Sequence, residues 1–141
     1  MAEEILVKEP LTKGMIEAGQ ELLNRIEQAG DPNLMAAFWR YKAEGNNWQL
    51  VLVSPQAESD GLISVLGKVR SLIYGSPAKI PGIDLLDITV IGPRERVALG
   101  LAERNREHDL SGQRLSNYYV NGTFIDDGYM YFMRSDIAPP N

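Results

Sequence analysis

The sequence contains a single histidine, His108, which stands in a polar segment with acidic residues on either side. Histidine is the side-chain type that ordinarily changes charge near neutral pH, so it is the first candidate for a general acid or base. Asp126 and Asp127 could add a carboxylate to such a site. No evident nucleophile is near His108, and a solvated loop histidine is the simpler interpretation. A hydrolase or nuclease that uses His108 with Asp126 or Asp127 is therefore the third of three functional hypotheses.

Five arginines are concentrated in segment 94–114, where they outnumber four acidic residues, although the whole chain is acidic. Gly92-Pro93 precedes this segment and places two of them in the first turn of a predicted helix. The unpaired backbone N–H groups of a helix N-terminus favour an anion. Pairing of these arginines with surface acids is the simpler interpretation. The second hypothesis is a nucleotide- or phosphate-recognising domain that binds a small anionic ligand through Arg94, Arg96, Arg104, Arg106 and Arg114.

Six of the eleven aromatic residues lie between positions 118 and 132. Successive residues of a strand point to opposite faces, so the pairs at 118–119 and 131–132 predict aromatic side chains on both faces of a hairpin. Tyr and Arg are enriched at protein interfaces, where Lys is depleted, and no Lys follows Lys79. The leading hypothesis is a protein-interaction or regulatory module. It is expected to bind a protein partner or a second copy of itself, as a homodimer, through Tyr118, Tyr119, Tyr129 and Tyr131.

The motifs of the large cofactor-dependent and metal-dependent families are missing from the sequence. It contains no G-x-G-x-x-G, no P-loop, no G-x-S-x-G and no H-E-x-x-H. With no cysteine and one histidine, it cannot build a thiolate or histidine-rich metal site. We therefore expect no cofactor and no metal, and the sequence leaves open whether the protein is an enzyme.

Length and composition are those of an ordinary globular protein. The 141 residues are 44% apolar and 23% charged, which suits one domain over 1–141 and excludes disorder of the whole chain. The acidic N-terminus and the absence of a long apolar run predict a cytoplasmic protein without a membrane segment. The formal net charge of −5 argues against nucleic acid as a partner, because the phosphate backbone repels an acidic protein.

The spacing of apolar residues predicts three helices. The first runs from Thr12 to Ala29 and is followed by Gly30, a residue that commonly ends helices. The second runs from 60 to 74, with Asp60 as its candidate N-cap, and the third from about 94 to 104. Prolines fall between these periodic segments, where their missing N–H does least harm.

Alternating residues predict the strands. Segment 35–53 is typical of a hairpin, and 86–90 of a further strand. Asn121-Gly122 is the strongest hairpin signal, because both residues accept the positive φ of a type I′ turn. A β-bulge is predicted at Asp127-Gly128. The alternation also places four side chains on one face of the first predicted strand, namely Ala36, Phe38, Arg40 and Lys42.

The elements predict an α+β fold. With a short edge strand at 5–7, the order is β-α-β-β-α-β-α-β-β, a ferredoxin-like start extended by a helix and a C-terminal hairpin. We expect a two-layer domain, a mainly antiparallel sheet with helices on one face, and a disordered tail at 136–141. We also expect loop 105–114 to lie against the C-terminal hairpin, with any small-molecule pocket between them.

Overall fold

The computed structural model describes residues 10–75 and 78–137, and within them one sheet of five strands organises the chain. The sheet order is β3-β2-β1-β5-β4. Strand β2 pairs with β3 in parallel, and the other neighbouring strands are antiparallel. This mixed sheet with helices confirms the α+β class. The strands are β1 (Ala36–Lys42), β2 (Asn47–Val53), β3 (Ile88–Ile91), β4 (Arg114–Val120) and β5 (Thr123–Met133).

Three helices agree with the apolar periodicity, the last of them running three residues past its expected end, and a short fourth helix at 56–59 was not predicted. Helix α1 (Lys13–Ala29) begins after Thr12, whose side chain accepts a hydrogen bond from the backbone N–H of Met15, and ends at Gly30 with φ 73°. The other helices are α2 (Gln56–Ser59), α3 (Leu62–Tyr74), α4 (Arg96–Glu107) and a 3-10 turn, η1 (Leu85–Asp87). The N-cap expectation for Asp60 is wrong, because Gly61 holds that position and no side chain caps α3.

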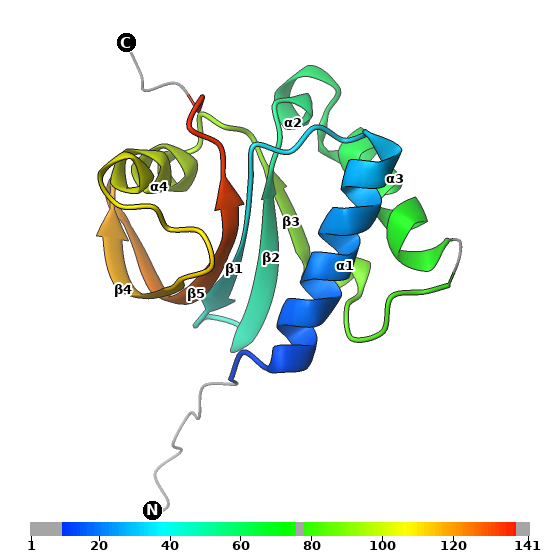
Figure 1. The fold of residues 1–141 in the computed structure, drawn as a ribbon, viewed down its shortest axis with the longest axis horizontal. Helices are drawn as coiled ribbons and strands as arrows, with labels where there is room; N and C mark the ends of the chain where they lie inside the picture. The colour runs from blue at the N-terminus through cyan, green and yellow to red at the C-terminus, as the bar shows by residue number, and fades with distance from the viewer. Residues whose placement is uncertain (1–9, 76–77, 138–141) are drawn as a thin grey trace, which may run out of the picture.

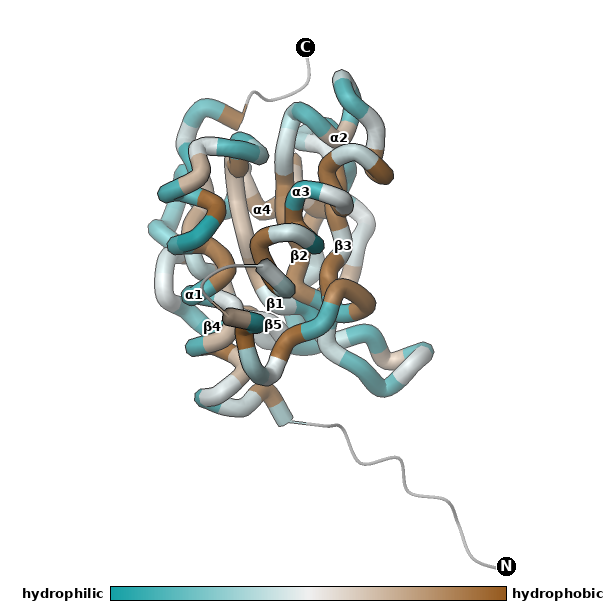
Figure 2. The backbone as a smooth tube through the Cα atoms, turned by 90° about the vertical axis from the view of Figure 1, so that its right-hand side faces the viewer, coloured by the Kyte–Doolittle hydropathy of each residue, from teal (hydrophilic) through white to brown (hydrophobic). Residues whose placement is uncertain are grey.

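Helices α1 and α3 cover one face of the sheet. Leu22 of α1 and Val65 of α3 are fully buried there against Trp39, Leu50 and Leu52 of the central strands. Helix α1 packs on the sheet through its apolar stripe, because that stripe must be buried against another apolar surface. In Figure 2 the hydrophobic colour runs through the strands at the middle of the molecule, and hydrophilic segments lie mostly around them.

Helix α4 covers the opposite face, so the predicted two-layer arrangement with helices on one face is wrong. Ala98 and Leu101 of α4 pack against Phe38, Val51 and Leu115 in a second core. Figure 1 shows α1 and α4 on opposite sides of the sheet. Central strands therefore bury both of their faces, which explains why β1 and β2 are almost continuously apolar.

The ferredoxin-like start is also wrong. A split β-α-β unit separates its two parallel strands by another strand, whereas β2 and β3 are direct neighbours with Leu50 opposite Ile88. The chain passes from β2 to β3 through α2 and α3, which is a simple crossover on the α1 side. The predicted edge strand at 5–7 lies outside the described residues.

The C-terminal hairpin has the predicted turn but not the predicted bulge. Asn121 and Gly122 have φ values of 47° and 76°, which is the type I′ requirement. The register of β5 on β1 shifts instead at Tyr131, because Ala37 pairs with Phe132 and Phe38 pairs with Met130. The extra residue turns both Tyr131 and Phe132 toward the α1 side, where they pack against the first core. The expectation that these two rings face opposite ways is therefore wrong.

The chain beyond β5 is ordered further than the sequence predicts. Asp136 pairs with Arg134 at 2.7 Å, and Ile137 is buried in the second core. Residues 136 and 137 thus belong to the fold and not to a disordered tail, and 138–141 lie outside the described residues.

Candidate functional site

A pocket of about 370 Å³ opens on the α4 side of the sheet, where β1, β3 and the hairpin tip meet the first turn of α4. Three of its lining side chains are basic, and one of these comes from the arginine-rich segment. The lining residues are Arg40, Lys42, Val51, Thr89, Ile91, Glu95, Arg96, Val97 and Thr123.

Strand β1 positions two of the basic side chains. Phe38 points into the second core, and the two-residue period of the strand puts Arg40 and Lys42 on the same face farther along. At this end of β1, Arg40 and Lys42 face a pocket that Val97 of α4 also lines. Both come from positions that the alternation of residues 35–42 already places on one face.

Helix α4 contributes the third basic side chain and its own N-terminus. Arg96 is the first residue of the helix, and the preceding Glu95 makes no side-chain cap. The first backbone N–H groups of a helix have no partner within the helix and carry partial positive charge. Arg96 and Val97 both line the pocket, so this end of the helix faces it.

The electrostatics of Arg40 are unusual for a surface arginine. Its Nε atom is the one buried side-chain nitrogen or oxygen in the described residues that lacks a hydrogen-bond partner. Burial lowers the pKa of Arg40, although the nearby Glu44 carboxylate opposes that effect. Burial also lowers the pKa of Lys42, and repulsion from the Arg40 charge adds to the decrease. The surroundings of both side chains therefore disfavour their charged forms. An anion bound nearby would favour the charged forms again.

The hairpin tip closes one side of this pocket. The Arg40 guanidinium donates a hydrogen bond to the carbonyl of Phe124 at 3.1 Å. The side-chain amide of Asn121 donates to the carbonyl of Arg96 at 3.2 Å. Two of the basic residues are thus tied to the turn that follows β4, and this restricts their movement.

The other predicted arginines do not enter the pocket. Arg94 pairs with Glu58 at 2.8 Å, and Arg114 pairs with Asp127 at the same distance. Arg106 donates to the carbonyl of Ile137 at 2.9 Å. Arg104 lies 5.1 Å from the ring centroid of Tyr118 and donates to the carbonyl of Tyr119. Of the five arginines predicted to bind an anion, Arg96 is the one that lines this pocket together with Arg40 and Lys42.

The candidate catalytic residues are not brought together. His108 is the exposed C-cap of α4, and its backbone N–H donates to Arg104. Asp127 binds Arg114 and accepts a hydrogen bond from the backbone N–H of Gly128. Within 10–75 and 78–137, no hydrogen bond or ion pair connects His108 with Asp126 or Asp127.

The candidate interface tyrosines divide between surface and interior. Tyr119 is 67% exposed and lies 6.3 Å from the ring of Phe124, which is 49% exposed. The Tyr131 hydroxyl is internal, because it accepts from the Trp39 indole at 2.8 Å and donates to the Ile16 carbonyl at 2.6 Å. Tyr129 packs edge-on against Tyr131. The exposed aromatic surface is therefore the pair Tyr119–Phe124, and sequence analysis missed Phe124 as part of it.

Segment 105–114 lies against the hairpin, as predicted, although only 108–113 form a loop, because 105–107 continue α4 and Arg114 begins β4. The backbone N–H of Gly112 donates to the carbonyl of Met130 at 2.8 Å, and that of Met130 donates to Gln113 at 3.0 Å. The expectation that any small-molecule pocket lies between this segment and the hairpin is wrong, because a pocket of about 500 Å³ lies on the α1 side of the sheet. A pocket of about 210 Å³ is lined by residues of α4 and of the hairpin, Arg104 and Tyr119 among them.

Three comparisons, with protein-family models, with curated protein sequences and with solved structures, find no significant match to this chain. In the described part of the chain, no helix has the length and apolar character needed to cross a bilayer. The same residues contain no group of three acidic or histidine side chains arranged to hold a metal ion. A proposal for the function therefore has to be based on the pockets and side chains described above.

Proposed function

We propose that the protein is an anion-recognition module whose pocket on Arg40, Lys42 and Arg96 takes a phosphate group or an anion of similar size and charge. The observation that carries this proposal is the buried Nε of Arg40, which lacks a partner within the described residues. An unpaired buried donor on a charged group is costly, and an oxyanion in the adjoining pocket would offset the destabilised charge of the guanidinium.

The surroundings of the pocket support a compact anion. Arg96 stands at an uncapped helix N-terminus, where backbone N–H groups bind oxyanions. Thr123 adds a hydroxyl group that can donate a hydrogen bond, whereas the Thr89 hydroxyl already donates to the Gln49 side chain at 2.8 Å. Glu95 lines the same pocket, and Glu44 acts on Arg40 and Lys42, so the excess of positive charge is small. A small dianion fits this balance better than a polyanionic strand does.

We expect sulfate to bind at this pocket in the millimolar range or tighter, as followed by NMR chemical shifts at constant ionic strength. Arg96→Gln and Lys42→Gln should each weaken binding about tenfold, because each removes one charge-assisted hydrogen bond. Arg94→Gln is the matched control, since that arginine sits at the same helix entrance but pairs with Glu58. It should leave the affinity unchanged.

Equal affinity in all four proteins would contradict the proposal, as would shifts centred outside the pocket.

The pH dependence of sulfate binding is a second readout, because sulfate stays a dianion above neutral pH. The pKa of Lys42 lies below its ordinary value, so the group is charged below that pKa and neutral above it. Sulfate affinity should therefore fall as the pH rises through the lowered pKa of Lys42. Lys42→Gln should remove this decrease.

We also propose self-association through the hairpin, and the exposed pair Tyr119–Phe124 favours it. The two rings form a cross-strand pair on β4 and β5, and β4 is an edge of the sheet. Exposed aromatic side chains beside an arginine are typical of interface centres, and Arg104 donates to the Tyr119 carbonyl. A second copy of the chain is the partner proposed for this surface.

Light scattering over a range of concentrations tests this proposal. We expect a wild-type dimer and, for Tyr119→Ser with Phe124→Ser, a dissociation constant raised at least about tenfold, because both central side chains are lost. Tyr74→Ser is the control, since Tyr74 is 41% exposed on α3, far along the chain from the hairpin. A wild-type protein that stays monomeric at the highest concentration would contradict self-association.

A further inference from the structure

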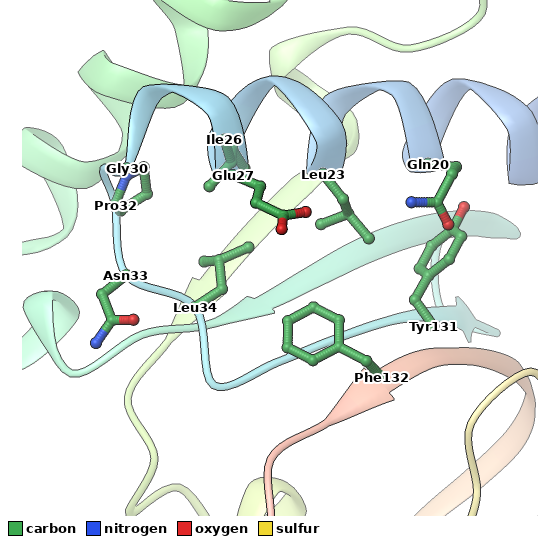
Figure 3. A pocket seen from close by; sticks show the side chains of 10 residues that line it. All are labelled: Gln20, Leu23, Ile26, Glu27, Gly30, Pro32, Asn33, Leu34, Tyr131 and Phe132. Carbon is green, nitrogen blue, oxygen red and sulfur yellow. The ribbon is translucent and has the colours of Figure 1, made fainter.

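A pocket on the α1 side of the sheet lies away from the basic pocket. It has about 500 Å³, a volume within the range of small-molecule sites. Figure 3 shows α1 on one side of it and the end of β5 on the other. The lining residues are Gln20, Leu23, Ile26, Glu27, Gly30, Pro32, Asn33, Leu34, Tyr131 and Phe132.

Two local features of the backbone form this pocket. The register shift at Tyr131 puts Phe132 on the α1 side, where a regular strand would have turned it to the other face. Gly30 ends α1 with φ 73°, and the chain then turns back through Pro32 to Leu34. Leu34 and Phe132 therefore face α1 across the pocket, while both remain partly exposed.

The inner wall of the pocket is apolar, and polar side chains line the rest of it. Leu23 and Ile26 of α1 are buried at their inner side, and Leu34 and Phe132 pack against the same core. A hydrocarbon group placed between them would bury apolar surface on both sides. Each buried methylene group is worth about 0.8 kcal/mol, or roughly a fourfold gain in affinity.

The polar groups of the lining are already engaged, with one exception. Gln20 donates to Asn24, and Asn33 accepts from Arg134. The Tyr131 hydroxyl binds both Trp39 and Ile16. Glu27 alone among the polar lining side chains makes no side-chain hydrogen bond or ion pair within the described residues. Figure 3 shows its carboxylate extending from α1 into the space that separates the helix from Leu34 and Phe132.

We infer that this pocket binds a small organic cation that carries a hydrocarbon chain, such as an alkylammonium. The ammonium group would pair with the Glu27 carboxylate, and the chain would lie between Leu23, Leu34 and Phe132. The charge of the site selects the class of ligand, because a carboxylate repels an anionic amphiphile of the same length. The neighbouring cation Arg134 does not neutralise Glu27, because its guanidinium is paired with Asp136. This inference does not depend on the basic pocket.

The test uses octylammonium, with octanoate as the ligand of equal chain length and opposite charge, both below their aggregation concentrations. NMR shifts should localise octylammonium to the lining residues, and octanoate should bind at least about tenfold more weakly. Glu27→Gln should weaken octylammonium binding about tenfold and remove the difference between the two ligands. Glu17→Gln is the matched control, because Glu17 is an exposed glutamate of the same helix and pairs with Lys13.

Equal binding of octylammonium to wild type and Glu27→Gln would overturn the inference. The same holds if octanoate binds as well as octylammonium, or if the shifts lie outside the pocket. Glu27 is exposed on α1, so its replacement by Gln is not expected to unfold the protein. The sulfate titration involves other residues on the other face, so either site can fail without the other.

Discussion

Gly19→Ala is expected to lower the free energy of unfolding by about 2–3 kcal/mol, although alanine is the better helix former. Gly19 is buried on α1, and a Cβ atom there would meet the Tyr131 hydroxyl and lie 2.9 Å from the Tyr131 Cζ. The Trp39 Nε1 atom would be 3.1 Å away. The Tyr131 ring cannot easily move, because its hydroxyl is bonded to Trp39 and Ile16. Urea denaturation, followed by circular dichroism, measures this loss.

Gly67→Ala provides the matched control for this prediction. Gly67 is an exposed glycine within α3, and a Cβ atom there would have no heavy atom within 4 Å. The same substitution should therefore stabilise the protein by about 0.5–1 kcal/mol, which is the helix-propensity difference. If Gly19→Ala stabilises the protein as Gly67→Ala does, α1 does not pack on Tyr131 as closely as described above.

Leu101→Ala is expected to lower the free energy of unfolding by about 2–5 kcal/mol. Leu101 is fully buried between α4 and the sheet, so its truncation leaves a cavity in the second core. Leu22→Ala should cost a similar amount, because Leu22 is equally buried beneath α1 in the first core. Equal effects on the two faces are expected only if both helices cover the sheet. Chemical denaturation of both variants tests this.

Leu86→Ala is the control for the cavity effect. Leu86 is 89% exposed, and its truncation should change the free energy of unfolding by less than about 0.5 kcal/mol. A loss as small as this for Leu101→Ala would show that α4 adds no second core. The fold would then be the two-layer arrangement predicted from the sequence.

The candidate site was only partly predictable. Arg96 stands next to the predicted helix start, and the helix N-terminus suggested an anion. Arg40 and Lys42 come from β1, more than fifty residues earlier in the chain, and they reach Arg96 only because α4 packs over the end of that strand. Their shared strand face was visible in the alternation of residues 36–42. The sequence did not show which helix would cover that face, because no residue near β1 or near α4 indicates that these two segments pack together.

Local structure followed from the sequence wherever neighbouring residues decide the backbone conformation. Thr12 and Gly30 mark the ends of α1, and Asn121-Gly122 forms the hairpin turn, because caps and positive-φ turns depend on a few adjacent residues. The tertiary structure alone decided the position of the bulge. Tyr131 becomes the extra residue of β5 because its hydroxyl reaches Trp39 and Ile16, and it thereby turns Phe132 toward α1. Contacts between residues about a hundred positions apart select that register, so no local pattern in the sequence could indicate it.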